Sequence, residues 1–229
     1  MNVIVPNDYP VYLKWLPSND EVLNYETDIK KSDNLIHDAD VIFYLDFNKI
    51  HRTLQMQNSL SNSSAIKILI DHHEEPDIDC DFLISNSNIS STAELVYDFI
   101  LKIDKTINRN IASCIYTGIL TDTGSFKYPN VSSKTHEIIS DLLNHKINHS
   151  NIHQKLYDSQ SKSRFKLLNI FMNNLSFLND DKIAFSFLYE SDLKCCKFAK
   201  GDTEGFVNFP LSLSSAVSYT HLRAHETVV

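Results

Sequence analysis

The chain has 229 residues, a formal net charge of −8, 42% hydrophobic residues and 22% charged residues. This length allows one large domain or two small ones with a real hydrophobic core, and the composition argues against intrinsic disorder. The negative charge argues against a broad basic surface for long duplexes, although a bound metal ion would still attract a small anionic substrate.

The cysteine pattern indicates a reducing compartment. No two of the four cysteines have CxxC spacing, and nothing resembles a disulfide framework. The chain also has no apolar run of membrane-spanning length and no basic, apolar and small-residue export signal at its start. We therefore expect a soluble cytoplasmic protein that does not associate with membranes.

Short β-branched runs alternate with helical patterns in the first half of the chain. Strands are predicted at Val3–Val5, Val41–Leu45 and Ile66–Ile70, with a short helix at Tyr9–Leu16 and a longer one at Lys49–Leu60. This alternation is typical of βαβ units. It predicts an α/β fold with a parallel sheet and helices on both faces.

The second half is mainly helical. Capping-box spacing at Ser91–Glu94 opens one helix, and further helices are predicted at Ile111–Leu120 and Thr135–Leu143. Ile152–Leu175 reads as a helical linker, and strand-like sequence returns at Ile183–Leu188.

These patterns predict a first α/β domain over residues 1–150 and a helical linker over 151–174. A smaller second α/β domain should start within 175–217. Residues 218–229 break the pattern and resemble an out-of-frame translation of sequencing-adapter DNA. We expect this tail to be non-native and exclude its two histidines from functional reasoning.

Two predicted strands end in groups that can bind metal. Asp46 follows one strand, and Asp71, His72 and His73 follow the next. Ligands of open parallel sheets lie outside the carboxyl ends of the strands, so these side chains should meet. A buried acid without a partner is costly, which makes a cation a natural occupant of this edge.

A third acid, Asp122, lies late in an otherwise apolar helix and is flanked by Gly118 and Gly124. The chain has only 4 glycines, so this placement suggests a tight turn or a close backbone approach. Carboxylates and imidazoles without thiolate suit Mn²⁺ or Mg²⁺, and two such ions about 3.5–4 Å apart can activate water for phosphoester hydrolysis.

Each residue also has a structural interpretation. Asp46 alone fits a turn or helix-cap residue, and Asp122 could simply bond local backbone. A single histidine near an acid is usually a hydrogen-bonded core or surface group. The Asp71-His72-His73 triplet directly after a buried strand is harder to explain structurally.

Four segments taken together resemble the DHH-type phosphoesterases: LDF at 45–47, DHHEEPD at 71–77, SSTAELVYDFI at 90–100 and IYTGILTDTGSFKYP at 115–129. The chain is most similar to the bacterial oligoribonuclease/phosphoadenosine-phosphate phosphatase (nano-RNase) branch, which is related to RecJ exonucleases. KGDTEGFVNFPLSL at 200–213 resembles the opening of that branch's DHHA1-type second domain.

The resemblance implies a role for each residue. Asp46 would bridge two Mn²⁺ (or Mg²⁺) ions, and His72 and Asp122 would ligate the second ion. His73 would act in catalysis by contacting the scissile phosphate or leaving group. Asp71 would be a ligand or would orient an imidazole. The implied substrates are short RNA oligonucleotides and phosphoadenosine phosphate, and a homodimer is a candidate assembly.

The chain departs from the family pattern at both ends. The first family motif, a His-Asn-Pro-Asp-Gly-Asp loop, is absent, because its only candidate, Pro6-Asn7-Asp8, lacks the histidine and the second aspartate. The Gly-Gly-Gly-His segment of the second domain is also missing. We therefore expect an internal fragment with impaired activity. The alternatives are a non-catalytic nucleotide-binding module and another DHH enzyme, either a single-strand exonuclease or an inorganic pyrophosphatase.

Overall fold

The computed structural model describes residues 1–103, 106–179 and 183–212. The expected non-native tail at 218–229 lies outside these residues. The described chain forms two compact units: unit 1 holds residues 1–8 and 14–155, and unit 2 holds residues 9–13 and everything from residue 156 onward.

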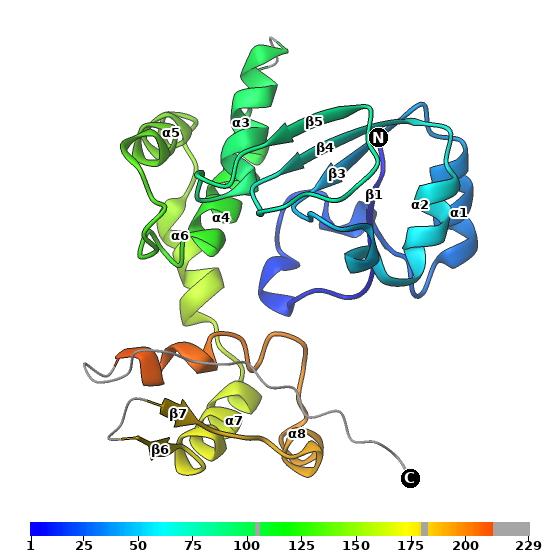
Figure 1. The fold of residues 1–229 in the computed structure, drawn as a ribbon. Coiled ribbons are helices and arrows are strands. Elements are labelled where there is room, and N and C mark those ends of the chain that lie inside the picture. Colours follow the sequence, from blue (N-terminus) through cyan, green and yellow to red (C-terminus); the bar gives the residue numbers. More distant parts are fainter. Residues whose placement is uncertain (104–105, 180–182, 213–229) are drawn as a thin grey trace. The chain divides into compact units, whose positions relative to one another are not determined.

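Unit 1 is built around two small parallel sheets and the helices that follow their strands (Figure 1). One sheet pairs β1 with β2, and the other has the order β3-β4-β5. The strands are β1 (Val3–Val5), β2 (Val22–Asn24), β3 (Val41–Leu45), β4 (Ile66–Asp71) and β5 (Phe82–Ser85). The helices of this unit are α1 (Ile29–His37), α2 (Gln57–Asn62), α3 (Thr92–Lys102), α4 (Arg109–Asp122), α5 (Ser133–Asn144) and α6 (His149–His153).

Consecutive residues of β3 face opposite sides of the sheet and meet different helices. Tyr44 is buried in a cluster with Ile36 of α1 and Leu60 of α2. Phe43 packs edge-on against Phe99 of α3 instead, with ring centroids 5.7 Å apart. Because alternate strand residues point to opposite faces, helices cover both faces of this sheet. The predicted α/β class with a parallel sheet is confirmed.

Two predicted helices of the first half differ in the structure. Tyr9–Leu16 contains only a 3-10 turn at Val11–Leu13, since a proline at each end restricts the backbone. Lys49–Leu60 begins as the 3-10 helix η3 (Ile50–Met56) and becomes α-helical only at α2. Leu54 has a φ of 54°, outside the helical region, which breaks the predicted continuous helix.

The predicted linker region is interrupted. α6 continues into a π-helical turn at Gln154–Asp158, and α7 (Lys162–Asn173) starts after a break, with the Ser161 hydroxyl accepting a hydrogen bond from the Arg164 backbone. The rest of unit 2 contains the antiparallel pair β6 (Ser176–Leu178) and β7 (Ile183–Phe185) and helix α8 (Glu190–Cys196). Its 3-10 turns are η5 (Phe206–Asn208) and η6 (Pro210–Ser212).

A short N-terminal strap, residues 9–13, belongs to unit 2 although the chain on either side of it belongs to unit 1. The Tyr12 hydroxyl donates a hydrogen bond to Glu204. Gly201, with a φ of 100°, lies so close to Pro10 that an added Cβ would come within 3.0 Å of the proline ring. The chain therefore passes between the two units three times.

No helix in the described ranges combines the length and apolar character that a bilayer crossing requires.

Candidate metal centre

The candidate site lies where β3 and β4 end. The two strands are parallel, with Leu45 opposite Ile70, so the residues that follow, Asp46 and Asp71, emerge at the same edge of the sheet. The Asp46 amide donates to the Ile70 carbonyl at 3.2 Å, and its φ of 66° turns the chain out of the strand. Aspartate tolerates this left-handed conformation better than most residues.

Three side chains converge at this edge. Asp46, His72 and His73 each offer one ligand atom, and these atoms lie within 4.8 Å of one another. His72 Nε2 is 3.7 Å from Asp46 Oδ1, and the two imidazole rings are 4.8 Å apart with a near-perpendicular arrangement. Such a group can hold a metal ion.

Hydrogen bonds fix the orientation of both imidazoles. His72 Nδ1 lies 3.2 Å from the Ile89 carbonyl oxygen, and His73 Nδ1 lies 2.7 Å from Asp71 Oδ1. A carbonyl oxygen only accepts, so Nδ1 of His72 carries the proton and Nε2 keeps its lone pair. Both rings therefore present Nε2 for a metal or a substrate, a common arrangement around metal-binding histidines.

Asp71 is fully buried at the base of this site. Its Oδ1 accepts from His73, but its Oδ2 has no hydrogen-bond partner among the residues that the structure describes. A carboxylate oxygen buried without a partner is costly, and a nearby cation would offset this cost. The orphaned oxygen is therefore an observation in favour of a cation at this edge.

Asp122 is the last residue of α4, and its carboxyl group interacts with the charges of the site residues. The pKa of Asp122 is raised to about 6, mainly by burial and then by the neighbouring Asp46 carboxylate, while His72, a hydrogen bond with Ser91 and His73 act in the opposite direction. The Asp122 carboxyl therefore interacts electrostatically with Asp46, His72 and His73, but it is not one of the three side chains whose ligand atoms group within 4.8 Å.

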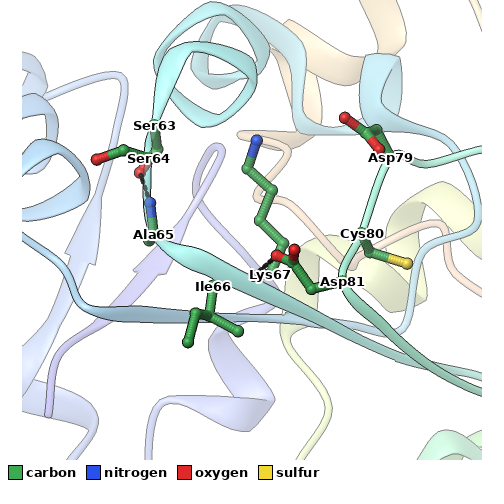
Figure 2. Close-up of a pocket in the computed structure, with 8 residues that line it drawn as sticks. All are labelled: Ser63, Ser64, Ala65, Ile66, Lys67, Asp79, Cys80 and Asp81. Carbon is green, nitrogen blue, oxygen red and sulfur yellow. Dashed lines mark hydrogen bonds between the residues drawn. The ribbon is translucent and has the colours of Figure 1, made fainter.

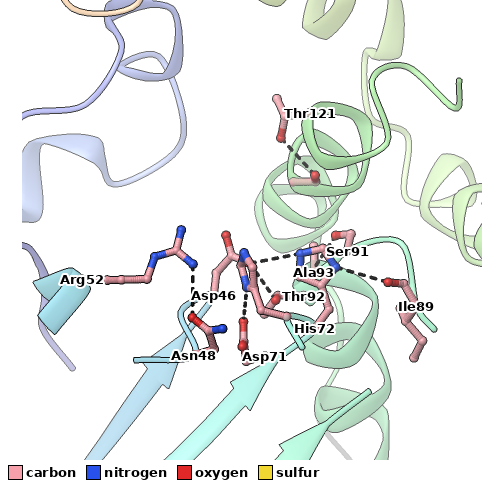
Figure 3. A network of polar contacts seen from close by, with 12 residues as sticks. Asp46, Asn48, Arg52, Asp71, His72, Ile89, Ser91, Thr92, Ala93 and Thr121 are labelled. Carbon is pink, nitrogen blue, oxygen red and sulfur yellow. Dashed lines mark hydrogen bonds and ion pairs between the residues drawn. The ribbon is translucent and has the colours of Figure 1, made fainter. Parts of the chain in front are cut away.

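The first turn of α3 supplies contacts that the sequence did not reveal. Thr92 donates a hydrogen bond of 2.8 Å to Asp46 Oδ1, and Ser91 caps the helix by accepting from the Ala93 amide (Figure 3). The Ser91–Glu94 pattern by itself predicts only a helix cap. The additional signal is that this cap follows β5, which runs parallel to the Asp-His-His strand and ends at the same edge of the sheet.

Thr92 lies at the start of α3 and Asp122 at the end of α4, and these two helices pack closely against each other. An added Cβ at Gly118 would lie 2.8 Å from the Ala93 Cβ, closer than real Cβ atoms approach. The predicted close backbone approach at Gly118 is therefore present. Gly124 serves the turn after α4, where its φ is 55° and the Tyr128 ring lies against it.

The opposite end of β4 carries a polar pocket that does not belong to this site (Figure 2). It is lined by Ser63–Lys67 and Asp79–Asp81. Burial raises the pKa of the Cys80 thiol, which disfavours a reactive thiolate. The pocket also contains no histidine, so the chemistry points to the other end of the strand.

The donor set of the site fits a hard divalent cation. Carboxylate oxygen and imidazole nitrogen converge, and no cysteine is among the grouped residues. Such ligands suit Mn²⁺ or Mg²⁺ better than a structural zinc ion. The residues present therefore fit the expected metal, with Asp71 Oδ2 as a further unsatisfied acceptor.

Comparisons with known proteins show to which family the chain is similar. Residues 4–119 match the family described as DHH family, N-terminal domain. A probable bifunctional oligoribonuclease and PAP phosphatase NrnA of Streptococcus mutans is 30% identical over 154 residues, covering 67% of this chain and 48% of that protein. The Bacillus subtilis bifunctional oligoribonuclease and PAP phosphatase NrnA is 32% identical over 101 residues, covering 43% of this chain and 32% of that protein.

A solved structure shows the same fold. The crystal structure of an exopolyphosphatase-related protein from Bacteroides fragilis has a TM-score of 0.89 at 40% identity, covering 94% of this chain and 64% of that protein. The chain thus spans less than half the length of the two NrnA relatives.

Proposed function

The chain belongs to the DHH family, and from this membership and its metal centre we propose that it is a metal-dependent phosphoesterase. The proposed substrates are short oligoribonucleotides and phosphoadenosine phosphate. The relatives named as oligoribonucleases and PAP phosphatases support this choice, as does the Asp and His set at the end of β3 and β4.

In this proposal unit 1 is the catalytic domain and unit 2 is the start of a DHHA1-type substrate domain, joined by the helical segment near residues 151–174. Cytoplasmic location is part of the proposal, because all four cysteines are free, as expected in a reducing compartment.

Asp46, His72 and Asp122 would hold the Mn²⁺ or Mg²⁺ ions. When bound, ions of this kind supply Lewis-acid polarisation of a phosphoryl group and a hydroxide nucleophile at neutral pH. The Thr92 hydroxyl holds Asp46 Oδ1, and the Ile89 carbonyl holds His72 so that Nε2 faces Asp46.

His73 would act on the substrate, and Asp71 would position its ring. Asp71 Oδ1 fixes the His73 ring through Nδ1, which leaves Nε2 directed away from the buried carboxylate. We propose that this nitrogen contacts the scissile phosphate or the leaving-group oxygen. Asp71 positions the ring and does not contact the substrate itself, because it is fully buried.

The observation that carries the proposal is the convergence of Asp46, His72 and His73 within 4.8 Å at the carboxyl ends of two parallel strands. The test is to incubate the protein with Mn²⁺ and four substrates in parallel: 5′-phosphorylated diadenylate, phosphoadenosine phosphate, inorganic pyrophosphate and a long single-stranded DNA. Release of mononucleotide and phosphate from the first two is expected, at a low rate because the first family motif is absent, and a chelator should abolish it.

Other outcomes would select another function. Preferential pyrophosphate hydrolysis would indicate a pyrophosphatase, and degradation of long DNA would indicate a single-strand exonuclease. Nucleotide binding without hydrolysis of any substrate would favour a non-catalytic binding module.

A further inference from the structure

One cation lies beside this acidic site without an acidic partner. Arg52 in η3 is exposed, and no carboxylate in residues 1–103, 106–179 and 183–212 forms an ion pair with it. Figure 3 shows its side chain reaching toward Asn48 and Asp46, on the opposite side of Asp46 from the α3 residues in this view. Because no carboxylate neutralises the Arg52 guanidinium in these ranges, it is available to an anionic ligand.

Asn48 orients this arginine. Its Nδ2 donates a hydrogen bond of 2.7 Å to the Glu74 carbonyl, and since that oxygen can only accept, the amide group must present Oδ1 on its other side. Arg52 Nη1 donates to this Oδ1 at 3.5 Å. A contact of this length is weak, so most of the donor capacity of the guanidinium remains available to a ligand.

Backbone contacts connect this pair to the Asp-His-His segment. Glu74 directly follows His73, and the Asp77 amide donates to the Asn48 carbonyl at 2.7 Å. Lys49 and Asp77 form an isolated parallel bridge. The loop after β4 therefore holds Asn48 next to the candidate metal ligands. Arg52 reaches this region through its contact with the Asn48 side chain.

The charges of the site indicate what this cation would bind. The site holds the carboxylates of Asp46 and Asp71 beside two imidazoles, whereas the proposed substrates carry negatively charged phosphates. A guanidinium binds a phosphate oxyanion through two parallel hydrogen bonds, which a lysine cannot reproduce. We propose that Arg52, oriented by Asn48, binds a phosphate group of the substrate. This inference rests on the proposed function and names the residue that would recognise the anionic part of the nucleotide.

The test measures binding of a product-like ligand, so it does not depend on turnover. Adenosine 5′-monophosphate and adenosine are titrated calorimetrically into the Mn²⁺-loaded protein and into the R52A, R52K and R109A variants. Arg109 is an exposed arginine at the start of α4 and serves as the matched control. Loss of a charge-assisted hydrogen-bonded pair should weaken binding of the monophosphate by about tenfold or more in R52A.

A smaller loss is expected in R52K, because its charge remains but the two-pronged geometry is lost. R109A should bind the monophosphate as tightly as the wild type does. Adenosine affinity should be equal in all four proteins. The Mn²⁺ affinity of R52A, measured by electron paramagnetic resonance, should equal that of the wild type. Equal monophosphate affinity in R52A and R109A would overturn the proposal, as would a wild type that does not bind the monophosphate or an R52A variant that loses Mn²⁺. An Arg52-dependent affinity without diadenylate hydrolysis would sustain this inference and reject the proposed activity.

Discussion

Thr92 in the first turn of α3 donates a hydrogen bond of 2.8 Å to Oδ1 of Asp46, which lies directly after β3. The bond joins residues 46 positions apart and occupies one acceptor site of a carboxylate that belongs to the proposed metal centre. It sets the direction in which Asp46 faces His72.

Replacing Thr92 by valine removes this hydrogen bond at nearly constant volume. Because outer contacts of a metal ligand commonly change affinity by 10–100-fold, we expect Mn²⁺ affinity of T92V to fall by roughly tenfold. Calorimetric Mn²⁺ titration provides the measurement. T92S keeps the hydroxyl and should bind within about twofold of the wild type, whereas equal losses in both variants would point to packing instead.

Asp46→Asn removes the negative charge of the central ligand. We expect Mn²⁺ binding to be lost within the measurable range, and any diadenylate hydrolysis to fall by at least about 10²-fold, because an amide is a poor ligand for a hard cation. Asp40→Asn is the matched control, since Asp40 is an exposed acid that precedes the same strand at its other end. Retained Mn²⁺ affinity in D46N would contradict the assignment of Asp46.

Gly118→Ala tests the close packing of α3 on α4. Alanine usually stabilises a helix interior relative to glycine by up to about 1 kcal/mol, but here its Cβ would overlap that of Ala93 at 2.8 Å. Overpacking of this kind costs about 1–3 kcal/mol, so we expect net destabilisation in urea unfolding together with weaker Mn²⁺ binding.

The A93G substitution supplies the control for this effect. Removing the opposing Cβ should make the G118A substitution less harmful in the double variant than in the wild-type background. A coupling of about 1 kcal/mol or more is expected from a double-mutant cycle. Additive effects would show that the two helices accommodate the extra methyl group without strain.

Asp122 should make the metal-free protein less stable at neutral pH. The pKa of its carboxyl group rises from the ordinary aspartate value of 3.8 to about 6 in the fold, so the folded state retains a proton that the unfolded state releases between these values. The contribution of Asp122 to the free energy of unfolding is therefore most favourable below about pH 4. It becomes less favourable as the pH rises through about 6 and stays so above that pH.

Asp122→Asn removes this dependence. With a chelator present, D122N should exceed the wild type in unfolding free energy by on the order of 1–2 kcal/mol at about pH 7.5, after allowance for solvent screening. The difference should vanish near pH 4. Chemical denaturation at both pH values measures it, and a wild type whose stability is flat across this range would refute the assigned cause.

The convergence of the candidate metal ligands at one edge of the sheet was predictable because it follows from general sheet geometry. Asp46 and the Asp71-His72-His73 triplet each terminate an apolar run, and parallel strands bring their carboxyl ends together. The contribution of Thr92 was not predictable in the same way. A threonine after a capping serine has a sufficient local role, and its bond to Asp46 depends on how α3 packs in three dimensions.

Short and partly exposed elements also escaped prediction. β5 has four residues, most of them exposed, so it lacks the buried apolar character that identified β3 and β4. The segments that became β2 and α1 were not assigned for a related reason, since β2 has only three residues and α1 buries only Ser32 and Ile36. In such elements tertiary pairing decides the conformation more than local pattern does.

The strap at residues 9–13 limits how this protein can be dissected. Severing the backbone after Lys155 would not yield two self-sufficient halves, because Tyr12 would remain on one piece and its acceptor Glu204 on the other. Each half would then expose a surface that its own sequence does not cover. Any attempt to express unit 1 separately should therefore relocate or replace the strap instead of trimming the C-terminal side alone.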